Sequence, residues 1–203
     1  MNLVQDILTY WYGQWPYDSQ IASTKASIWF TSTPEIDKDI EVRFKTEIDR
    51  LLKQDAQADT FKLDLPNQLD QALAIIILLD QFTRNVYRGS HKAFAGDPKA
   101  LAVCLSILDA NLLASMPLNV AAFACMPLQH SEDPKIQELA IETFDQLYEI
   151  HGETAKGYAD FARVHKNIID EFGRYPHRND AIGRPSTDAE QSYLNSDGHR
   201  FGQ

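Results

Sequence analysis

The stretch PEIDKDIEVRFKTEIDRLLKQD, residues 34–55, shows most clearly how this chain folds. Its apolar residues recur every three or four positions, and they are Ile36, Ile40, Phe44, Ile48 and Leu51. That spacing places them on one face of an α-helix, with the charged residues on the other face. Pro34 suits the first turn of a helix, and Thr33 suits the capping position before it. The stretch therefore predicts a long helix with one buried face.

The same signals predict helices along most of the chain. Asp97 and Asp133, each followed by proline, are expected to be N-caps, and a capping box runs from Thr187 to Glu190. Pro127 and Gly173 are expected to end helices, Gly173 as the residue after a C-cap. The expected helices cover residues 66–85, 97–112, 118–126, 133–147, 153–172 and 187–194. The helix over 66–85 is apolar on all faces, so it is predicted to be the most buried.

No segment shows the alternating pattern of a β-strand. The connections between helices are short, so neighbouring helices are expected to pack antiparallel. We therefore predict an all-α fold, with antiparallel helix pairs in a tetratricopeptide-like array. One domain over residues 1–203 is expected from the length. Residues 173–203 are expected to form a C-terminal loop and a short helix that packs back on the domain.

Composition and charge exclude several classes of protein. The net charge of −10 and the pI near 5.0 argue against a non-specific binder of nucleic acid or of an anionic membrane. The longest apolar run, residues 73–79, is far shorter than the roughly 20 residues of a membrane span. The first residues lack the pattern of a secretion signal, so a cytoplasmic protein is expected. Cys104 and Cys125 are expected to be buried thiols, no CxxC spacing or Cys/His cluster is present, and no cofactor is expected.

The segment DQFTRNVYRG, residues 80–89, is the first candidate site. Asp80 directly follows the apolar run, so its carboxylate is expected near the interior, where it needs a partner. Arg84 lies four residues on, and Asn85 and Arg88 follow it. Two interpretations remain open. In the first, Asp80 and Arg84 form a purely structural ion pair at the end of the helix. In the second, Asp80 orients the guanidinium of Arg84 toward a bound carboxylate or phosphate.

The segment QHSED, residues 129–133, is the second candidate, in a loop predicted between two helices. His130 with Glu132 or Asp133 fits an acid–base pair or, more weakly, a metal site. The alternative is structural, with Asp133 as a cap and His130 in a loop contact. His165 lies on an apolar helical face and is expected to be a core histidine.

The segment EFGRYPHRNDAIGR, residues 171–184, is the third candidate. Glycines and a proline bracket a turn that holds Arg174, His177, Arg178 and Asn179. Five of the nine arginines of the chain fall in this segment and in residues 80–89, which indicates specific pairing. The partner is either a ligand or an acidic side chain of the protein itself.

Four motifs together closely resemble a bacterial helical family known as domain of unknown function 924. The motifs are WF (29–30), LLDQFTRNVYRGSHKAFAGDPKAL (78–101), MPLQHSED (126–133) and FGRYPHRNDAIGRPST (172–187). The resemblance covers nearly the whole chain and implies an all-helical, tetratricopeptide-like fold. It brings no established activity, substrate or cofactor. Thr83 and Tyr175 stand where the family motif has proline and phenylalanine. The residues after the WF pair also differ from the family pattern, which argues against a ligand contact near Trp29.

Three functions are compatible with these motifs. The first is a binding module with an Arg- and His-lined pocket for a small anionic ligand, a phosphate or carboxylate. The second is a protein-interaction scaffold in which the arginines are structural ties. The third is an enzyme using a histidine and an aspartate in acid–base chemistry, placed last because no nucleophile motif, phosphate loop or metal spacing is present. The candidate binding residues are Asp80, Arg84, Asn85, Arg88, His130, Glu132, Arg174, His177, Arg178 and Asn179.

Overall fold

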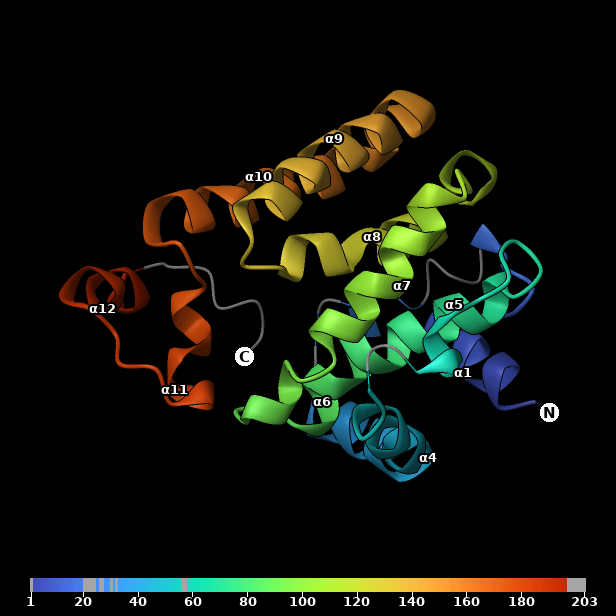
Figure 1. Ribbon diagram of the computed structural model, residues 1–203, viewed down its shortest axis with the longest axis horizontal. Helices are drawn as coiled ribbons and strands as arrows, with labels where there is room; N and C mark the ends of the chain where they lie inside the picture. Colours follow the sequence, from blue (N-terminus) through green and yellow to red (C-terminus); the bar gives the residue numbers. More distant parts are fainter. Residues whose placement is uncertain are drawn as a thin grey trace.

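Figure 1 shows the computed structural model, which describes residues 2–19, 25, 28–29, 31, 33–55 and 58–196. Within these residues every regular element is a helix and none is a strand. The predicted all-α fold is therefore confirmed. Phe30 of the WF motif, Arg200 and the rest of residues 197–203 lie outside the described residues.

The helices follow one another along the chain with short connections. The α-helices are α1 (Leu3–Tyr12), α4 (Pro34–Leu52), α5 (Leu69–Ile76), α6 (Thr83–Val86), α7 (Asp97–Asp109), α8 (Leu118–His130), α9 (Pro134–His151), α10 (Lys156–Phe172), α11 (Asn179–Ile182) and α12 (Asp188–Asn195). A π-helical turn, η3 (Ile77–Phe82), joins α5 to α6 without a break. The short 3₁₀ helices are η2 (Asp59–Phe61), η4 (His91–Ala93), η5 (Leu113–Ser115), η6 (Gly152–Ala155) and η7 (Pro176–Arg178).

Several predicted helix ends are confirmed by their hydrogen bonds. The side chains of Thr33 and Asp133 each accept a hydrogen bond from a backbone N–H in the first turn of the following helix. Thr187 and Glu190 form the reciprocal capping box at the start of α12. Gly173 ends α10 with a φ of 69°, in the left-handed region that favours glycine. These local signals act within one turn of helix, so the sequence alone is sufficient to predict them.

Two predicted helix starts are wrong. Asp97 is not an N-cap: Gly96 precedes α7, and Asp97 is its first helical residue. Its carboxylate binds two arginines instead of capping the helix. The helix expected from residue 66 begins at Leu69, because Pro66 lies in a turn.

The prediction that Pro127 stops a helix is also wrong. The helix α8 continues past Pro127 to His130, so His130 lies at the end of a helix and not in a loop. Proline removes one backbone hydrogen bond and costs about 3 kcal/mol inside a helix. Burial of the neighbouring side chains, Leu128 among them, offsets much of this cost.

The centre of the molecule is formed by α5, η3 and α8. Residues 72–80 are all buried, which confirms that this helix is the most buried one. Aromatic side chains join it to α1 and α8: the ring of Trp11 lies 5.6 Å from that of Phe82 and 5.1 Å from that of Phe123. The helices α4 and α7 pack on either side of this centre (Figure 1).

The second half of the chain is built from helix pairs. The helices α9 and α10 lie side by side in Figure 1, and since only η6 joins them, they run antiparallel. The segment after α10 folds back toward the end of α8, where the hydroxyl of Tyr175 donates to the carbonyl oxygen of Gln129. Among the described residues, no helix has the length and apolar character needed to cross a lipid bilayer.

Candidate functional site

A cavity of about 720 Å³ lies where α1, the η3–α6 helix, α8, α10 and η7 meet. The described residues that line it are Trp11, Ile28, Trp29, Thr31, Gln81, Arg84, Asn85, Arg88, Phe94, Phe123, Met126, Gln129, His130, Thr154, Gly157, Tyr158, Phe161, His165, Tyr175, His177 and Arg178. The three segments singled out from the sequence, far apart along the chain, therefore contribute to one cavity. Its volume is typical of a site for a small organic molecule.

A histidine–carboxylate pair lies at one wall of the cavity. The Nδ1 atom of His130, the last residue of α8, lies 2.7 Å from Oδ1 of Asp80 in η3. Asp80 is 0% exposed, and its Oδ2 accepts a hydrogen bond of 2.6 Å from Gln81. The π-helical turn inserts an extra residue into the helix at this point, a feature often found at functional sites. Asp80 thus lies behind the cavity wall, while the ring of His130 forms part of that wall.

The protonation of this pair follows from its surroundings. Burial lowers the pKa of His130, and the positive charge of Arg84 lowers it further, although Asp80 acts in the opposite direction. Burial by itself raises the pKa of Asp80, but His130 and Arg84 outweigh it and hold that pKa below its usual value. At neutral pH the pair is therefore a neutral imidazole beside an ionised carboxylate. Since the carboxylate only accepts hydrogen bonds, Nδ1 of His130 carries the proton and donates it.

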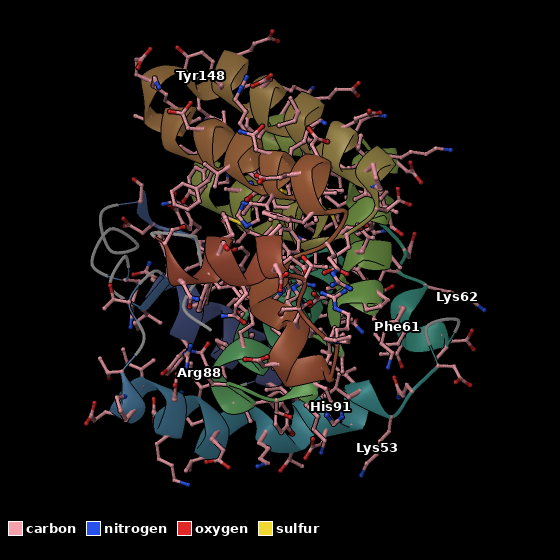
Figure 2. The ribbon with its side chains drawn as sticks, turned by 90° about the vertical axis from the view of Figure 1, so that its left-hand side faces the viewer. Lys53, Phe61, Lys62, Arg88, His91 and Tyr148 are labelled. Carbon is pink, nitrogen blue, oxygen red and sulfur yellow. The ribbon has the colours of Figure 1, made fainter. Side chains whose placement is uncertain are left out.

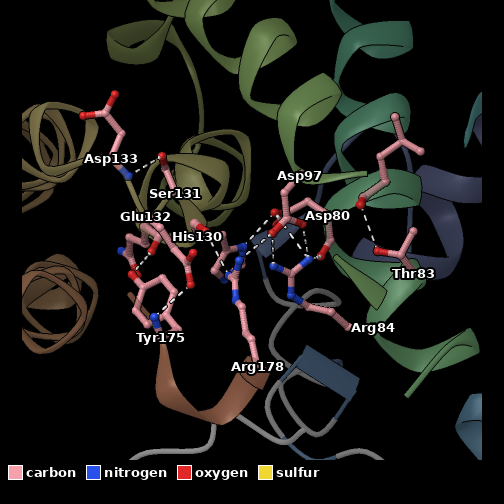
Figure 3. Close-up of polar contacts among 12 residues, drawn as sticks. Asp80, Thr83, Arg84, Asp97, His130, Ser131, Glu132, Asp133, Tyr175 and Arg178 are labelled. Carbon is pink, nitrogen blue, oxygen red and sulfur yellow. Dashed lines mark hydrogen bonds and ion pairs between the residues drawn. The ribbon is translucent and has the colours of Figure 1, made fainter. Parts of the chain in front are cut away.

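Arg84 and Arg178 share one carboxylate, that of Asp97 (Figure 3). Arg84 binds it as a fork, with Nη1 2.9 Å from Oδ1 and Nη2 3.1 Å from Oδ2. Arg178 donates through Nη1 to the same Oδ2 at 3.1 Å, and through Nη2 to the backbone oxygen of His130 at 2.9 Å. Two cations that are far apart in the sequence therefore meet beside the histidine–carboxylate pair.

Arg178 is the less well compensated of the two arginines. It is 7% exposed, and its guanidinium lies between the rings of Phe94 and Tyr175, at 4.6 and 4.7 Å from their centres. Its buried Nε has no hydrogen-bond partner in the part of the chain that the structure describes. Burial lowers the pKa of Arg178, and Arg84 adds to this while Asp97 opposes it. For Arg84, Asp97 and Asp80 outweigh burial, and its pKa is raised.

Two further histidines of the cavity are also neutral. Burial is the main cause in both cases: it lowers the pKa of His165 to about 3 and, with help from Arg178, that of His177 to about 2. His165 is 4% exposed and its Nδ1 lies 2.8 Å from the backbone oxygen of Phe161. It is buried as predicted, but it also lines the cavity.

The rest of the cavity wall is largely apolar and aromatic. Trp11, Trp29 and Phe123 form one side, with the rings of Trp29 and Phe123 5.0 Å apart. Met126 and Phe161 lie on the helices α8 and α10. Trp29 lines the cavity although the sequence argued against a ligand contact near it. The site therefore has a polar wall of arginine and histidine and an apolar wall of aromatic side chains.

Six of the ten predicted binding residues line this cavity: Arg84, Asn85, Arg88, His130, His177 and Arg178. Two of them are also bound to α4, which lies beside Arg88 in Figure 2. Asn85 donates to Asp37 at 2.8 Å, and Arg88 donates to the same carboxylate at 3.0 Å. Asp80 does not line the cavity, but its carboxylate contacts His130, which does.

The remaining three predicted residues, Glu132, Arg174 and Asn179, do not line the cavity and form internal ties. Glu132 binds both Nη atoms of Arg184, at 2.7 and 2.8 Å. Arg174 binds Glu190 at 2.5 and 2.7 Å. Asn179 is buried and accepts from Arg184 at 2.9 Å. Each of these three residues therefore has a partner within the protein.

Sequence reasoning missed several residues of the site. Asp97 was assigned to a cap, because an Asp-Pro pair is the usual signal of a helix start. Its contacts with Arg84 and Arg178 have a sequence separation of 13 and 81 residues, and no local pattern indicates them. The aromatic wall has no sequence signal of its own, because the wall of a ligand cavity and a hydrophobic core have the same composition. Among the described residues, no group of three or more His, Cys, Asp or Glu side chains is arranged to hold a metal ion.

Comparison with known proteins gives a family and a fold. The sequence profile of a group described as bacterial proteins of unknown function, DUF924, matches residues 7–198. The solved structure of ATU0120, a protein of unknown function from Agrobacterium tumefaciens, has a similar fold with a TM-score of 0.74. The two chains are 25% identical, and the match covers 95% of this chain and 96% of that one. Among curated proteins, none matches the sequence.

Proposed function

The chain belongs to the DUF924 family of bacterial proteins of unknown function, and since that family brings no activity, we propose a function from the cavity itself. The proposed function is to bind a small organic anion, a carboxylate or phosphate, with an apolar body. The anionic group lies at the wall formed by Arg178 and the histidines. The body lies against the wall formed by Trp11, Trp29 and Phe123.

The observation that carries the proposal is the state of Arg178. This cation is almost fully buried, shares the carboxylate of Asp97 with Arg84, and has an Nε without a partner among the described residues. A buried cation needs a paired anion, and an unmet buried donor costs about 1–3 kcal/mol. An anion next to Arg178 supplies both the charge and the acceptor.

The charges of the cavity favour a small ligand that carries one anionic group. Asp80 and Asp97 offset most of the charge of Arg84 and Arg178, and Arg88 is paired with Asp37. The cavity is therefore close to neutral and not strongly basic, in a protein with a net charge of −10. Such a site repels polyanions and accepts one charged group, and most of its binding energy comes from burial of the apolar body.

Thermal unfolding in the presence of 2-naphthoate, 2-naphthyl phosphate and uncharged 2-naphthol tests the proposal. At about 100 times its dissociation constant, a ligand stabilises the folded state by about 2.7 kcal/mol. We expect stabilisation by one of the two anions and not by the alcohol, and loss of that effect in Arg178→Met. Arg163→Met is the matched control, because Arg163 pairs with Asp145 on an exposed surface. Equal effects of anion and alcohol, or full binding by Arg178→Met, would contradict the proposal.

A further inference from the structure

We infer that His130 is a general base in this cavity, and that the cavity hydrolyses a carboxylic ester with an apolar acyl group through a water molecule that His130 activates. Asp80 acts as the positioning residue of His130, and Arg178 stabilises the negative charge that develops on the acyl oxygen. The inference uses the same cavity and the same Arg178 as the proposed function, but the reacting pair is His130 and Asp80.

The orientation of the His130 ring is the first argument. Nδ1 is bound to a carboxylate that is 0% exposed, so the ring is held in one direction and in one tautomer. The opposite ring atom, Nε2, has no hydrogen-bond partner among the described residues, and the residue lines the cavity. A neutral imidazole with Nδ1 protonated presents a lone pair on Nε2. That is the arrangement by which histidine takes a proton from a reactant.

The position of Asp80 is the second argument. A buried carboxylate is costly unless it is fully bound, and Asp80 is bound by His130, Gln81 and the nearby Arg84. Its binding to His130 stabilises the imidazolium ion that forms when Nε2 accepts a proton. Asp80 lies in the π-helical turn, beside His130. Such turns are rare in helices and are frequently found at functional sites.

The cation of Arg178 lies beside His130. The Nη2 atom of Arg178 lies 2.9 Å from the backbone oxygen of His130, so a group that reacts at the ring lies close to Arg178. The charge of Arg178 is incompletely balanced, as described above. Negative charge that appears only during the reaction is therefore stabilised there without new movement of the protein.

Water is the nucleophile in the step that we infer, because no serine or cysteine is present among the described residues that line the cavity. Nε2 of His130 takes a proton from water while the water oxygen bonds to the acyl carbon, and the carbonyl electron pair moves onto the acyl oxygen. The carbonyl then re-forms, the bond to the alkoxy oxygen breaks, and that oxygen takes the proton from Nε2. One ester and one water give one carboxylic acid and one alcohol, and His130 ends neutral, as it began.

Hydrolysis of p-nitrophenyl acetate and p-nitrophenyl butyrate by the full chain tests the inference. A general base contributes roughly 10²–10⁴-fold to the rate, so we expect His130→Asn and His130→Gln to lose at least about 10²-fold in kcat/KM. His91→Asn is the matched control for simple attack by a surface imidazole, since His91 is exposed and is not one of the residues that line the cavity. A wild type no faster than the His130 variants, or an equal loss in His91→Asn, overturns the inference.

Asp80→Asn tests the positioning role through readouts that a purely structural residue does not change. We expect kcat to fall with little change in KM, and the Nδ1 proton of His130 in the ¹⁵N spectrum to move to Nε2. In the wild type, kcat should rise with pH as His130 loses its proton, and this rise should be absent in His130→Gln. The groups that surround the ring and set that pH range are Asp80, Arg84, Asp97, Arg178, His165 and His177.

Binding of 2-naphthoate separates this inference from the proposed function. If His130→Asn binds 2-naphthoate like the wild type but neither protein hydrolyses the esters, the inference fails and the anion site stands. If the wild type hydrolyses the esters in a His130-dependent way without binding 2-naphthoate, the anion site fails and the inference stands.

Discussion

Gly96 packs directly against the backbone of Leu79. A Cβ atom at Gly96 would lie 2.2 Å from the carbonyl oxygen of Leu79, closer than real Cβ atoms approach any such atom. This contact sets the start of α7 against the π-helical turn. It also brings the next residue, Asp97, to Arg84, so the arginine pair of the cavity depends on the absence of a side chain at Gly96.

Gly96→Ala should therefore disturb both the fold and the cavity. The blocking atoms belong to the backbone of Leu79 and cannot rotate away, so we expect a loss of about 1–3 kcal/mol in the free energy of unfolding, measured with urea. Gly157→Ala is the control, because nothing lies within 4 Å of its added Cβ and its site is helical. It should be neutral or stabilise by up to about 1 kcal/mol. Similar losses in both variants would argue against the packing explanation.

Replacing the carboxylate that Arg84 and Arg178 share should cost more than replacing a surface carboxylate. Asp97→Asn leaves two buried cations close together with one partner removed, so we expect a loss of about 3–5 kcal/mol. Asp145→Asn breaks an exposed pair with Arg163 and should cost at most about 1 kcal/mol. Urea denaturation of the two variants measures the difference. A loss below 1 kcal/mol in Asp97→Asn would mean that solvent or movement compensates the two arginines.

Most helices could be predicted because their signals are local. The apolar face of α4, the caps Thr33 and Asp133 and the capping box at Thr187 all act within a few residues. The predictions that are wrong concern places where contacts between residues distant in sequence determine the local structure. Pro127 remains inside α8 because buried neighbours outweigh the lost hydrogen bond.

Several charged residues of the site could be predicted from the sequence. How the fold brings them together could not. Clustering of arginines pointed to Arg84 and Arg178, and both line the cavity. The same clustering pointed to Arg174, which is tied to Glu190 outside the cavity. The local sequence around Arg174 resembles that around Arg84 and Arg178. Only the position of the partner carboxylate in the fold distinguishes an arginine of the cavity from one in an internal ion pair.

The stability of the protein should fall as the pH drops below about 6.5, the ordinary pKa of histidine. Burial lowers the pKa of His165 to about 3 and that of His177 to about 2 in the folded chain. Below pH 6.5 the unfolded chain therefore binds protons that the folded chain does not bind. The stabilisation is complete above that pH and is lost progressively as the pH falls.

His177→Gln should make this pH dependence shallower, by up to about 1.4 kcal/mol per pH unit. The groups that face His177 are Arg178, Arg84, His165 and His130, and their charges stay constant over the range if the histidines remain neutral. Urea denaturation between about pH 5 and pH 7 measures the slope. His91→Gln is the control, because His91 is exposed, and its slope should equal that of the wild type. An unchanged slope in His177→Gln would show that His177 is protonated in the folded state.

Arg84 and Arg178 should respond differently to loss of their charge. Arg84→Met removes the fork on Asp97 and the charge beside Asp80, so the buried carboxylate of Asp80 and the partly buried carboxylate of Asp97 each lose a partner. We expect a loss of about 3–5 kcal/mol in the free energy of unfolding.

Arg178→Met should cost only about 1–2 kcal/mol, chiefly through the hydrogen bond to the backbone oxygen of His130, because Asp97 keeps its fork with Arg84. It removes a buried charge that the protein balances incompletely, which offsets part of the loss. Urea denaturation of both variants, with 2-naphthoate binding measured on the same samples, separates the two roles. A stable Arg178→Met that no longer binds the anion supports the ligand site. A loss as large as that of Arg84→Met would instead show that Arg178 is a structural tie, and the scaffold interpretation would then account for all the arginines of the chain's two Arg-rich segments.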